Sequence, residues 1–321
     1  MTHMIPRRLG GRSEVLAVGH VTQDRICHSA GRPAEEWHEQ PGGSAFYAAA
    51  VLASLGIGTT VLTKLAARDR ARLLSPLEAL GVEIAPRPAA ATTCFENRYL
   101  DGIRQQRVLR LAPPFLAGDF HGLSASAIQL GPLIKDDIAP AAVTEARKRC
   151  RLLAIDVQGL LRRLSGGRVR PFAGVERSAL AQADILKADR EEARLLTSLG
   201  DPRGAARRLA QLCRGEALVT LGAQGVLLAE GDRLHEIPAV DAGPVVDTTG
   251  CGDSLLAAYL ARRLRGDAPL AAARFATVVA AMKATRYGPF QMVEGTGATA
   301  LETVNRMMRE GPDGATLNHR N

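Results

Sequence analysis

A seven-residue turn that ends in a carboxylate contains the residue types best suited to chemistry. Residues 247–253 read Asp-Thr-Thr-Gly-Cys-Gly-Asp, and an apolar run with helical spacing follows them. Helix N-termini present unpaired N–H groups and partial positive charge, so the amides of Gly250, Cys251 and Gly252 could hold an anion. Asp253 would lie beside that anion as a base, which suits transfer of a phosphoryl group to a hydroxyl. The alternative is an ordinary capped helix start.

Short apolar runs that alternate with helical patterns must position this turn. The runs that we predict as strands are residues 15–19, 59–65, 152–157, 183–187 and 217–221. Between them, residues 44–55 and 69–80 have the pattern of helices ended by glycine. This alternation predicts an α/β fold with a parallel sheet covered on both faces. Ligands bind outside the carboxyl ends of such strands, so we expect the loops that hold Asp24, Asp156, Lys187, Asp189 and Gly222 to converge.

Residues 92–109 do not follow this alternation of strands and helices. Their alternating polar pattern around Asp101-Gly102 predicts two antiparallel strands joined by a tight turn. Such a hairpin could be a lid that excludes water from a transfer reaction, or a plain edge hairpin.

Composition excludes several classes of protein. The 321 residues are 46% hydrophobic and 23% charged, as in a globular protein of one large or two smaller domains. No apolar run is long enough to span a membrane, and residues 1–8 do not read as a signal peptide. The five scattered cysteines favour a reducing, cytoplasmic location without a zinc site. The net charge of +8 is spread over helical stretches without interleaved aromatics, so we expect no nucleic-acid partner.

Two signatures resemble those of the ribokinase-like (PfkB) carbohydrate kinases. Residues 42–56 begin Gly-Gly-Ser-Ala-Phe-Tyr, and residues 246–253 read Val-Asp-Thr-Thr-Gly-Cys-Gly-Asp, with Cys251 where alanine is usual. Between them, residues 219–225 match the family's Thr-Leu-Gly-x-x-Gly turn. The resemblance covers residues 15–288. It implies a three-layer αβα ribokinase-like fold with a mainly parallel central sheet, a small β-strand lid, and an ATP-dependent kinase of a small alcohol.

The same resemblance suggests how the chain is organised. Residues 1–321 would be a single kinase domain with lid segments inserted at about 20–40 and 92–111. We interpret residues 311–321 as a polar C-terminal tail and expect a homodimer formed through the lid. Residues 92–99, 130–133 and 156–162 are similar to the inositol-kinase-like branch of the family.

The matching positions imply catalytic and metal-binding roles. Asp253 would be the general base, and the amides from Gly250 to Gly252 would hold the charge on the transferred group. Glu192 takes the position of the family's glutamate associated with Mg²⁺, and Asp189 replaces an asparagine in the same region. The alternative for these two residues is a capping box at a helix start, and the two roles are compatible.

Binding residues follow in the same way. The expected substrate-binding residues are Asp24, Gly42, Gly43, Tyr47 and Gln158. The expected residues for ATP are Lys187, Thr220, Gly222, Gly225, Thr249, Thr277 and Ala280. Tyr47 could pack on a sugar or cyclitol face, or be a buried helix residue.

Three alternatives stay open for the function. The acceptor could be a nucleoside rather than a sugar or cyclitol. The chain could be an inactive kinase-like binding protein, although the retention of Asp253 favours catalysis. A nucleic-acid-binding protein would need a localised basic face and a steep salt dependence.

Overall fold

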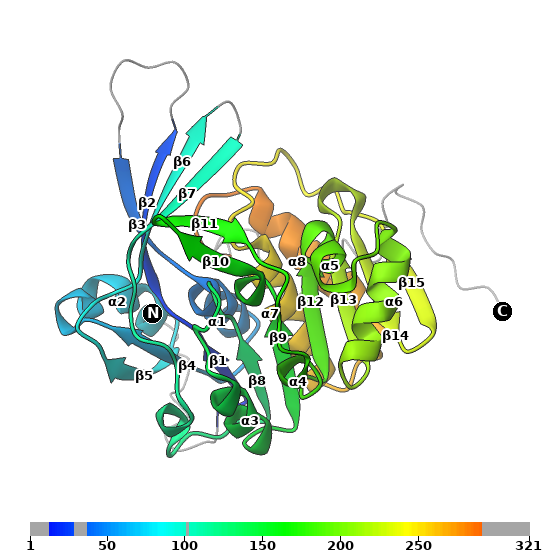
Figure 1. Ribbon diagram of the computed structural model, residues 1–321, viewed down its shortest axis with the longest axis horizontal. Coiled ribbons are helices and arrows are strands. Elements are labelled where there is room, and N and C mark those ends of the chain that lie inside the picture. Colours follow the sequence, from blue (N-terminus) through cyan, green and yellow to red (C-terminus); the bar gives the residue numbers. More distant parts are fainter. Residues whose placement is uncertain (1–12, 29–36, 101–102, 291–321) are drawn as a thin grey trace, which may run out of the picture.

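The computed structural model describes residues 13–28, 37–100 and 103–290, and a nine-stranded sheet forms its centre (Figure 1). From edge to edge its strands are β15 (Arg233–Ile237), β14 (Val226–Glu230), β13 (Glu216–Thr220), β12 (Ile185–Asp189), β9 (Leu152–Asp156), β8 (Ala127–Leu130), β1 (Val15–Val18), β4 (Thr59–Leu65) and β5 (Glu83–Pro88). The strands from β13 to β5 pair in parallel, whereas β14 and β15 are antiparallel additions. The predicted mainly parallel sheet is therefore confirmed.

Both faces of this sheet are buried because alternate residues of its strands enter two separate hydrophobic clusters. In β1, Val15 and Ala17 enter one cluster, and Leu16 and Val18 enter the other. The first cluster is covered by α1 (Ser44–Ser54), α2 (Arg70–Ala79), α7 (Cys251–Leu264) and α8 (Pro269–Ala284). The second is covered by α3 (Pro140–Lys148), α4 (Arg177–Leu180), α5 (Arg190–Thr197) and α6 (Pro202–Leu212). Two helical layers thus enclose one sheet, as the αβα expectation requires.

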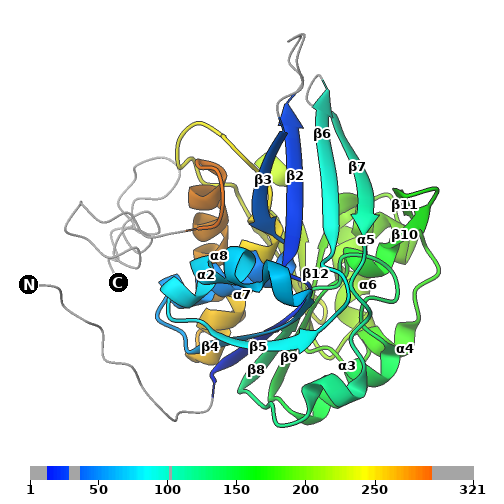
Figure 2. The ribbon, with the colours of Figure 1, turned by 90° about the vertical axis from the view of Figure 1, so that its left-hand side faces the viewer.

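A second, six-stranded sheet within the described residues projects from the central one (Figures 1 and 2). Its strands, in order, are β10 (Arg162–Ser165), β11 (Arg168–Pro171), β7 (Ile103–Arg110), β6 (Cys94–Leu100), β2 (Thr22–His28) and β3 (Trp37–Gly42). β6 and β7 form the predicted antiparallel hairpin, and β2 pairs with β6 in parallel. The predicted lid segments contribute strands to this sheet, but the β10–β11 hairpin was not predicted.

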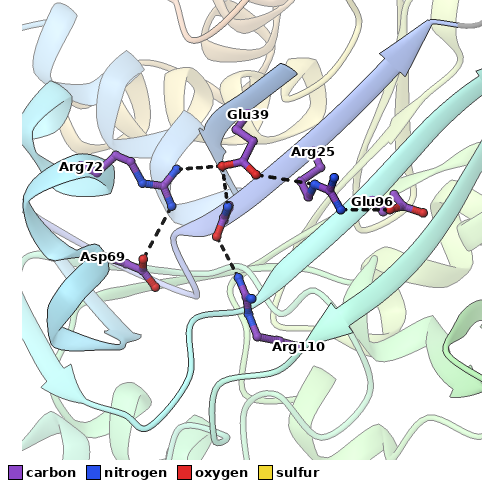
Figure 3. A network of polar contacts seen from close by, with 7 residues as sticks. Arg25, Glu39, Asp69, Arg72, Glu96 and Arg110 are labelled. Carbon is purple, nitrogen blue, oxygen red and sulfur yellow. Dashed lines mark hydrogen bonds and ion pairs between the residues drawn. The ribbon is translucent and has the colours of Figure 1, made fainter. Parts of the chain in front are cut away.

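Polar side chains link this second sheet to the helical layer beside it (Figure 3). The network consists of Gln23, Arg25, Glu39, Asp69, Arg72, Glu96 and Arg110. Glu39 on β3 lies 3.5 Å from Arg72 on α2, which joins the two parts directly. Because half-exposed ion pairs contribute little to stability, we attribute only a small stabilisation to this network.

The polar tail predicted at 311–321 lies outside the described residues. Within the ranges given above, no helix is both long and apolar enough to cross a lipid bilayer. A single domain over residues 1–321 and a homodimer through the lid stay predictions.

Candidate active site

The N-terminus of α7 opens onto a cavity of about 1000 Å³ lined by residues of both sheets. Of the predicted site residues, all except Gly42 and Glu192 line this cavity. The loops expected to converge do so, because Asp24, Asp156, Lys187, Asp189 and Gly222 all border it. They come from the carboxyl ends of parallel strands and from the adjoining second sheet, which is where such folds bind ligands.

Asp253 lies in the first turn of α7 and borders the cavity. The N-cap residue is Gly250, whose left-handed φ of 77° lets the chain turn sharply into the helix. The carbonyl of Gly250 accepts the Ser254 N–H at 2.9 Å. The Cys251 N–H donates to the Thr248 carbonyl at 3.2 Å, so this amide already has an acceptor. The turn is thus held by its own backbone before any ligand binds.

Close packing explains both glycines of the turn. A Cβ on Gly250 would lie 2.3 Å from Cγ of Tyr47, and one on Gly252 would lie 2.7 Å from Nζ of Lys187. Tyr47 is only 2% exposed, which fits the buried-helix alternative for it, although part of its side chain lines the cavity. The Tyr47 ring packs against Gly250, and the Lys187 ammonium packs against Gly252.

Lys187 is the buried cation of the site. Its Nζ lies 3.0 Å from Oδ2 of Asp156 at the end of the neighbouring strand. Burial alone lowers the pKa of Lys187, but the charges of Asp156, Glu192 and Asp253 outweigh this effect and the pKa lies above its usual value. The ammonium therefore stays charged, and it balances part of the negative charge of three carboxylates.

Asp189 and Glu192 form the capping box that the sequence allowed at the start of α5. The Glu192 N–H donates to Oδ1 of Asp189 at 2.8 Å, and the Asp189 N–H donates to Oε2 of Glu192 at 2.7 Å. Burial raises the pKa of Glu192 to about 7, with help from Asp156 and Asp189 and against the effect of Lys187. Only Asp189 of the pair reaches the cavity surface.

Burial also shifts the groups at the tip of α7. It raises the pKa of Asp253, an effect that Asp156 strengthens and Lys187 opposes. It raises the pKa of the Cys251 thiol to about 11, despite the helix N-terminus and the nearby charge of Lys283. A carboxylate with a raised pKa is a better proton acceptor, whereas a thiol with so high a pKa is inert at neutral pH.

The substrate-binding residues expected near the second sheet form a tight group. Asp24 is 5% exposed and accepts a hydrogen bond from Oγ1 of Thr22 at 2.7 Å. A Cβ on Gly42 would lie 2.4 Å from Oδ2 of Asp24, and one on Gly43 would lie 2.1 Å from the carbonyl oxygen of His20. Gly42 therefore lets the chain pass close to the Asp24 carboxylate, and Gly43 lets it pass close to the backbone of His20.

The residues expected to bind the nucleotide, apart from Lys187 beside Gly252, belong to another wall of the cavity. That wall contains Thr220, Gly222, Gly225, Val240, Val245, Thr249, Thr277, Ala280 and Ala281. Gly225 has φ 97°, and a Cβ there would lie 2.0 Å from the Ile237 carbonyl oxygen. Small and apolar side chains on α8 make much of this surface, which suits a flat ring better than a charged group.

Sequence reasoning missed several cavity residues. They are Thr22, Ser44, Phe95, Gln106 and Leu133. Phe95 and Gln106 come from the predicted hairpin, where a phenylalanine in a largely polar strand was the available signal. Ser44 stands beside the glycines of the first signature, and its side chain lowers the pKa of Asp253. Gln158 lines the cavity as expected, and its N–H donates to Oδ1 of Asp156 at 3.0 Å.

Sequence comparison relates the chain to known proteins over most of its length. The profile described as pfkB family carbohydrate kinase matches residues 12–294. The chain is 27% identical over 271 residues to a 1-phosphofructokinase of Rhodobacter capsulatus, covering 77% of this chain and 81% of that one. It is 24% identical over 252 residues to a putative 1-phosphofructokinase of Mycoplasma pneumoniae, covering 74% and 79%.

Solved structures share the fold over most of the chain. A sulfate complex of a pyrophosphate-dependent kinase in the ribokinase family has a TM-score of 0.78 and 25% identity, covering 86% of this chain and 97% of that one. The ribokinase of Thermotoga maritima has a TM-score of 0.71 and 21% identity, covering 86% and 94%. The chain therefore belongs to the PfkB family of carbohydrate kinases and has the ribokinase fold.

Proposed function

We propose that this carbohydrate kinase transfers the γ-phosphoryl group of ATP to a hydroxyl of a small sugar or cyclitol. The observation that carries the proposal is the place of Asp253. It borders the same cavity as the buried carboxylate of Asp24 and the apolar side chains of Val240 and Ala280. A polyol bound at Asp24 and an adenine bound at the apolar wall would meet beside Asp253.

The chemistry assigned to these residues is a single displacement. Asp253 accepts the proton of the acceptor hydroxyl as its oxygen forms a bond to the γ-phosphorus. The bond from that phosphorus to the β–γ bridging oxygen breaks, and ADP leaves with the electron pair. The amides of Gly250 and Gly252 hold the charge on the transferred group, and Cys251 contributes less because its amide is already bonded to Thr248.

The residues of the site fit a magnesium ion carried in by the donor. Within the described residues, no group of three or more His, Cys, Asp or Glu side chains is arranged to hold a metal by itself. Mg²⁺ typically takes one or two carboxylates and completes its shell with waters and substrate phosphates. Asp189 at the cavity surface and Glu192 behind it are the candidates, and the ion would neutralise charge on the phosphates.

The acceptor is assigned as a polyol from the polar and apolar groups at the Asp24 end. The Asp24 carboxylate can accept hydrogen bonds from two neighbouring hydroxyls, while Phe95 and Leu133 offer apolar contact to a ring face. A pyrophosphate-dependent relative, 26% identical with a TM-score of 0.75, is described in complex with myo-inositol, which favours a cyclitol. The second sheet would close over the acceptor as a lid and exclude water.

Pyrophosphate is the second candidate donor. Two structural relatives at 25% and 26% identity are described as pyrophosphate-dependent. The apolar wall of α8 favours ATP, because inorganic pyrophosphate gains nothing from apolar contact. A panel of ATP, GTP and pyrophosphate at equal concentration distinguishes the two donors.

The test combines an acceptor panel with an Asp253→Asn variant. Turnover is measured with cyclitols, pentoses, hexoses and nucleosides, and we expect the substitution to lower kcat about 10²–10⁴-fold. Asp201→Asn is the matched control, since Asp201 caps α6, away from the cavity lining, and asparagine caps equally well. Equal activity of Asp253→Asn and the wild type, or no turnover with any acceptor, would refute the proposal.

A further inference from the structure

Lys283 on α8 is a fully buried lysine whose ammonium group is surrounded by oxygen atoms. The residue is 0% exposed. Its Nζ donates to the carbonyl oxygen of Asp247 at 2.9 Å, to Oδ2 of Asp247 at 3.0 Å and to the carbonyl oxygen of Arg286 at 3.4 Å. These three acceptors match the three N–H donors of an ammonium group. Burying a charge is costly unless it is paired and hydrogen-bonded, and these three acceptors meet both conditions for the Lys283 ammonium.

Two of the three oxygen atoms around Lys283 belong to Asp247, in the turn that leads to Asp253, and the third is the carbonyl of Arg286 just after α8. Asp247 is the first residue of that turn, and its Oδ1 accepts the Thr249 N–H at 2.9 Å. The N–H groups of Val246 and Asp247 both donate to the Ala284 carbonyl, at 2.8 and 3.1 Å. Lys283 thus ties the end of α8 to the start of the turn through the carboxylate and the carbonyl of Asp247.

The aromatic ring of Tyr47 faces the same ammonium group from α1. The Lys283 Nζ lies 5.8 Å from the centre of the ring, a distance at which a cation is attracted by the π-system. The same ring is the surface against which Gly250 packs. The cation is therefore in contact with both supports of the anion-binding turn, namely Asp247 at its start and Tyr47 beneath Gly250.

We propose that Lys283 is a positioning residue whose ammonium group is a built-in monovalent cation that holds the turn of residues 247–253 in its active geometry. The inference rests on the proposed function, in which this turn binds the transferred phosphoryl group. Lys283 does not line the cavity, so it acts through the turn and not on the substrate. A second consequence follows: the wild-type enzyme needs no dissolved monovalent cation at this place.

The Asp247 carboxylate and the carbonyls of Asp247 and Arg286 form a cage around the Lys283 ammonium, and such a cage can also hold other small cations. Rings of carbonyl and carboxylate oxygens replace the hydration shell of K⁺, and ammonium is recognised by the same acceptors. Removing the side chain in Lys283→Ala leaves the Asp247 carboxylate and the two carbonyls around a space of about the size of the lost group. Free ammonium or potassium should enter that space, whereas tetramethylammonium is too large and donates no hydrogen bond.

The experiment measures kcat and KM of wild type and Lys283→Ala in ammonium, potassium and tetramethylammonium chloride at one ionic strength. Wild type should keep its kcat within about twofold in all three salts. Lys283→Ala should lose about 10²-fold in kcat in tetramethylammonium chloride, because small displacements of catalytic groups have such effects, and recover about tenfold in the other two. A wild-type kcat for Lys283→Ala, or a loss that neither cation restores, would overturn the inference.

Lys64 provides a matched control. It too is a buried lysine, with Nζ 2.7 Å from Oδ2 of Asp119, 2.9 Å from the Pro114 carbonyl and 5.6 Å from the centre of the Phe115 ring. It does not line the cavity. Lys64→Ala should lower the melting temperature while kcat stays within about twofold of the wild-type value in every salt. An equal loss of kcat in Lys64→Ala would show that any buried lysine has this effect, and would refute a specific role.

A second readout does not depend on activity. The melting temperature of Lys283→Ala should be higher in ammonium or potassium than in tetramethylammonium chloride, because the cation binds only the folded cage. The double variant Lys283→Ala/Asp247→Asn should lose this difference, since its cage no longer carries the negative charge. If Lys283→Ala does not fold, Lys283→Met removes the charge and keeps most of the stem, and a wild-type kcat in that variant would refute the inference. If wild type phosphorylates nothing, the proposed function fails while the melting comparison still decides this inference.

Discussion

The contact between Gly250 and Tyr47 leads to a prediction whose magnitude can be worked out from the structure. Gly250→Ala places a Cβ 2.3 Å from Cγ of Tyr47, well inside van der Waals contact, at a φ of 77°. The left-handed backbone costs an alanine about 1–2 kcal/mol. Overpacking against a buried ring adds about 1–3 kcal/mol. The variant should therefore lose about 2–5 kcal/mol of unfolding free energy.

Gly266→Ala is the matched control for the backbone part of this cost. Gly266 follows the other end of α7 at φ 89°, and nothing lies within 4 Å of the Cβ position. It should lose only about 1–2 kcal/mol. The difference between the two variants isolates the clash with the ring.

A double-mutant cycle tests the cause. Tyr47→Ala alone should cost about 3–5 kcal/mol through the cavity that it leaves. In Tyr47→Ala/Gly250→Ala the clash is absent, so the two costs should sum to about 1–3 kcal/mol more than the double variant loses. The measurement is chemical denaturation followed by fluorescence and circular dichroism. Additive costs, or a Gly250→Ala variant as stable as Gly266→Ala, would show that the ring does not support the turn.

The remaining predictions concern three titratable side chains. Burial lowers the pKa of His20 below 6.5, and the charge of Asp137 offsets part of this effect. As the pH drops below 6.5, the unfolded chain therefore binds a proton at His20 that the folded chain does not bind, and stability falls. His20→Gln should flatten this fall, seen as a smaller difference in melting temperature between about pH 7.5 and 5.5, and an unchanged difference would contradict it. Burial raises the pKa of the Cys251 thiol to about 11, so Cys251→Ala should keep kcat and the wild-type thiol should resist iodoacetamide at neutral pH. Peptide mapping locates any alkylation, and a rapid loss of activity on alkylation of Cys251 would contradict this prediction. Asp189→Asn keeps the helix cap but removes a carboxylate proposed to hold Mg²⁺, so the KM for MgATP should rise about fivefold, corresponding to about 1 kcal/mol. A lower KM would mean that the Asp189 carboxylate repels the donor phosphates and does not hold the metal.

The fold could be predicted from the sequence where burial on both faces produced continuous apolar runs. The run predicted at 59–65 coincides with β4, and the helix predicted at 44–55 ends within one residue of α1. β8 (Ala127–Leu130) has only four residues and includes the polar Gln129, so no run marks it. The β10–β11 hairpin is rich in arginine and half-exposed, and its place beside β7 depends on contacts far apart in the sequence.

Of the candidate site, too, only part could be predicted from the sequence. Glycines that must pass close to another group, such as Gly43 and Gly250, left a visible pattern in the sequence, as did the carboxylate at residue 253. Lys283 left none, because a single lysine near the end of an Ala-rich helix has the appearance of a solvated residue. Only the folded chain brings it to Asp247, 36 residues earlier. Support for a site that comes from a distant element is invisible to local patterns.

The charges around the cavity also bear on the donor. One ammonium, that of Lys187, stands close to three carboxylates, those of Asp156, Glu192 and Asp253. A triphosphate or a pyrophosphate brings further negative charge to this place, and the amides of the turn offer only the partial charge of a helix end. Like charges in a partly buried cavity repel strongly, so a donor without a cation would bind poorly whichever donor it is. We therefore expect the apolar wall on α8 to decide between ATP and pyrophosphate, and the carboxylates to make a divalent cation necessary with either donor.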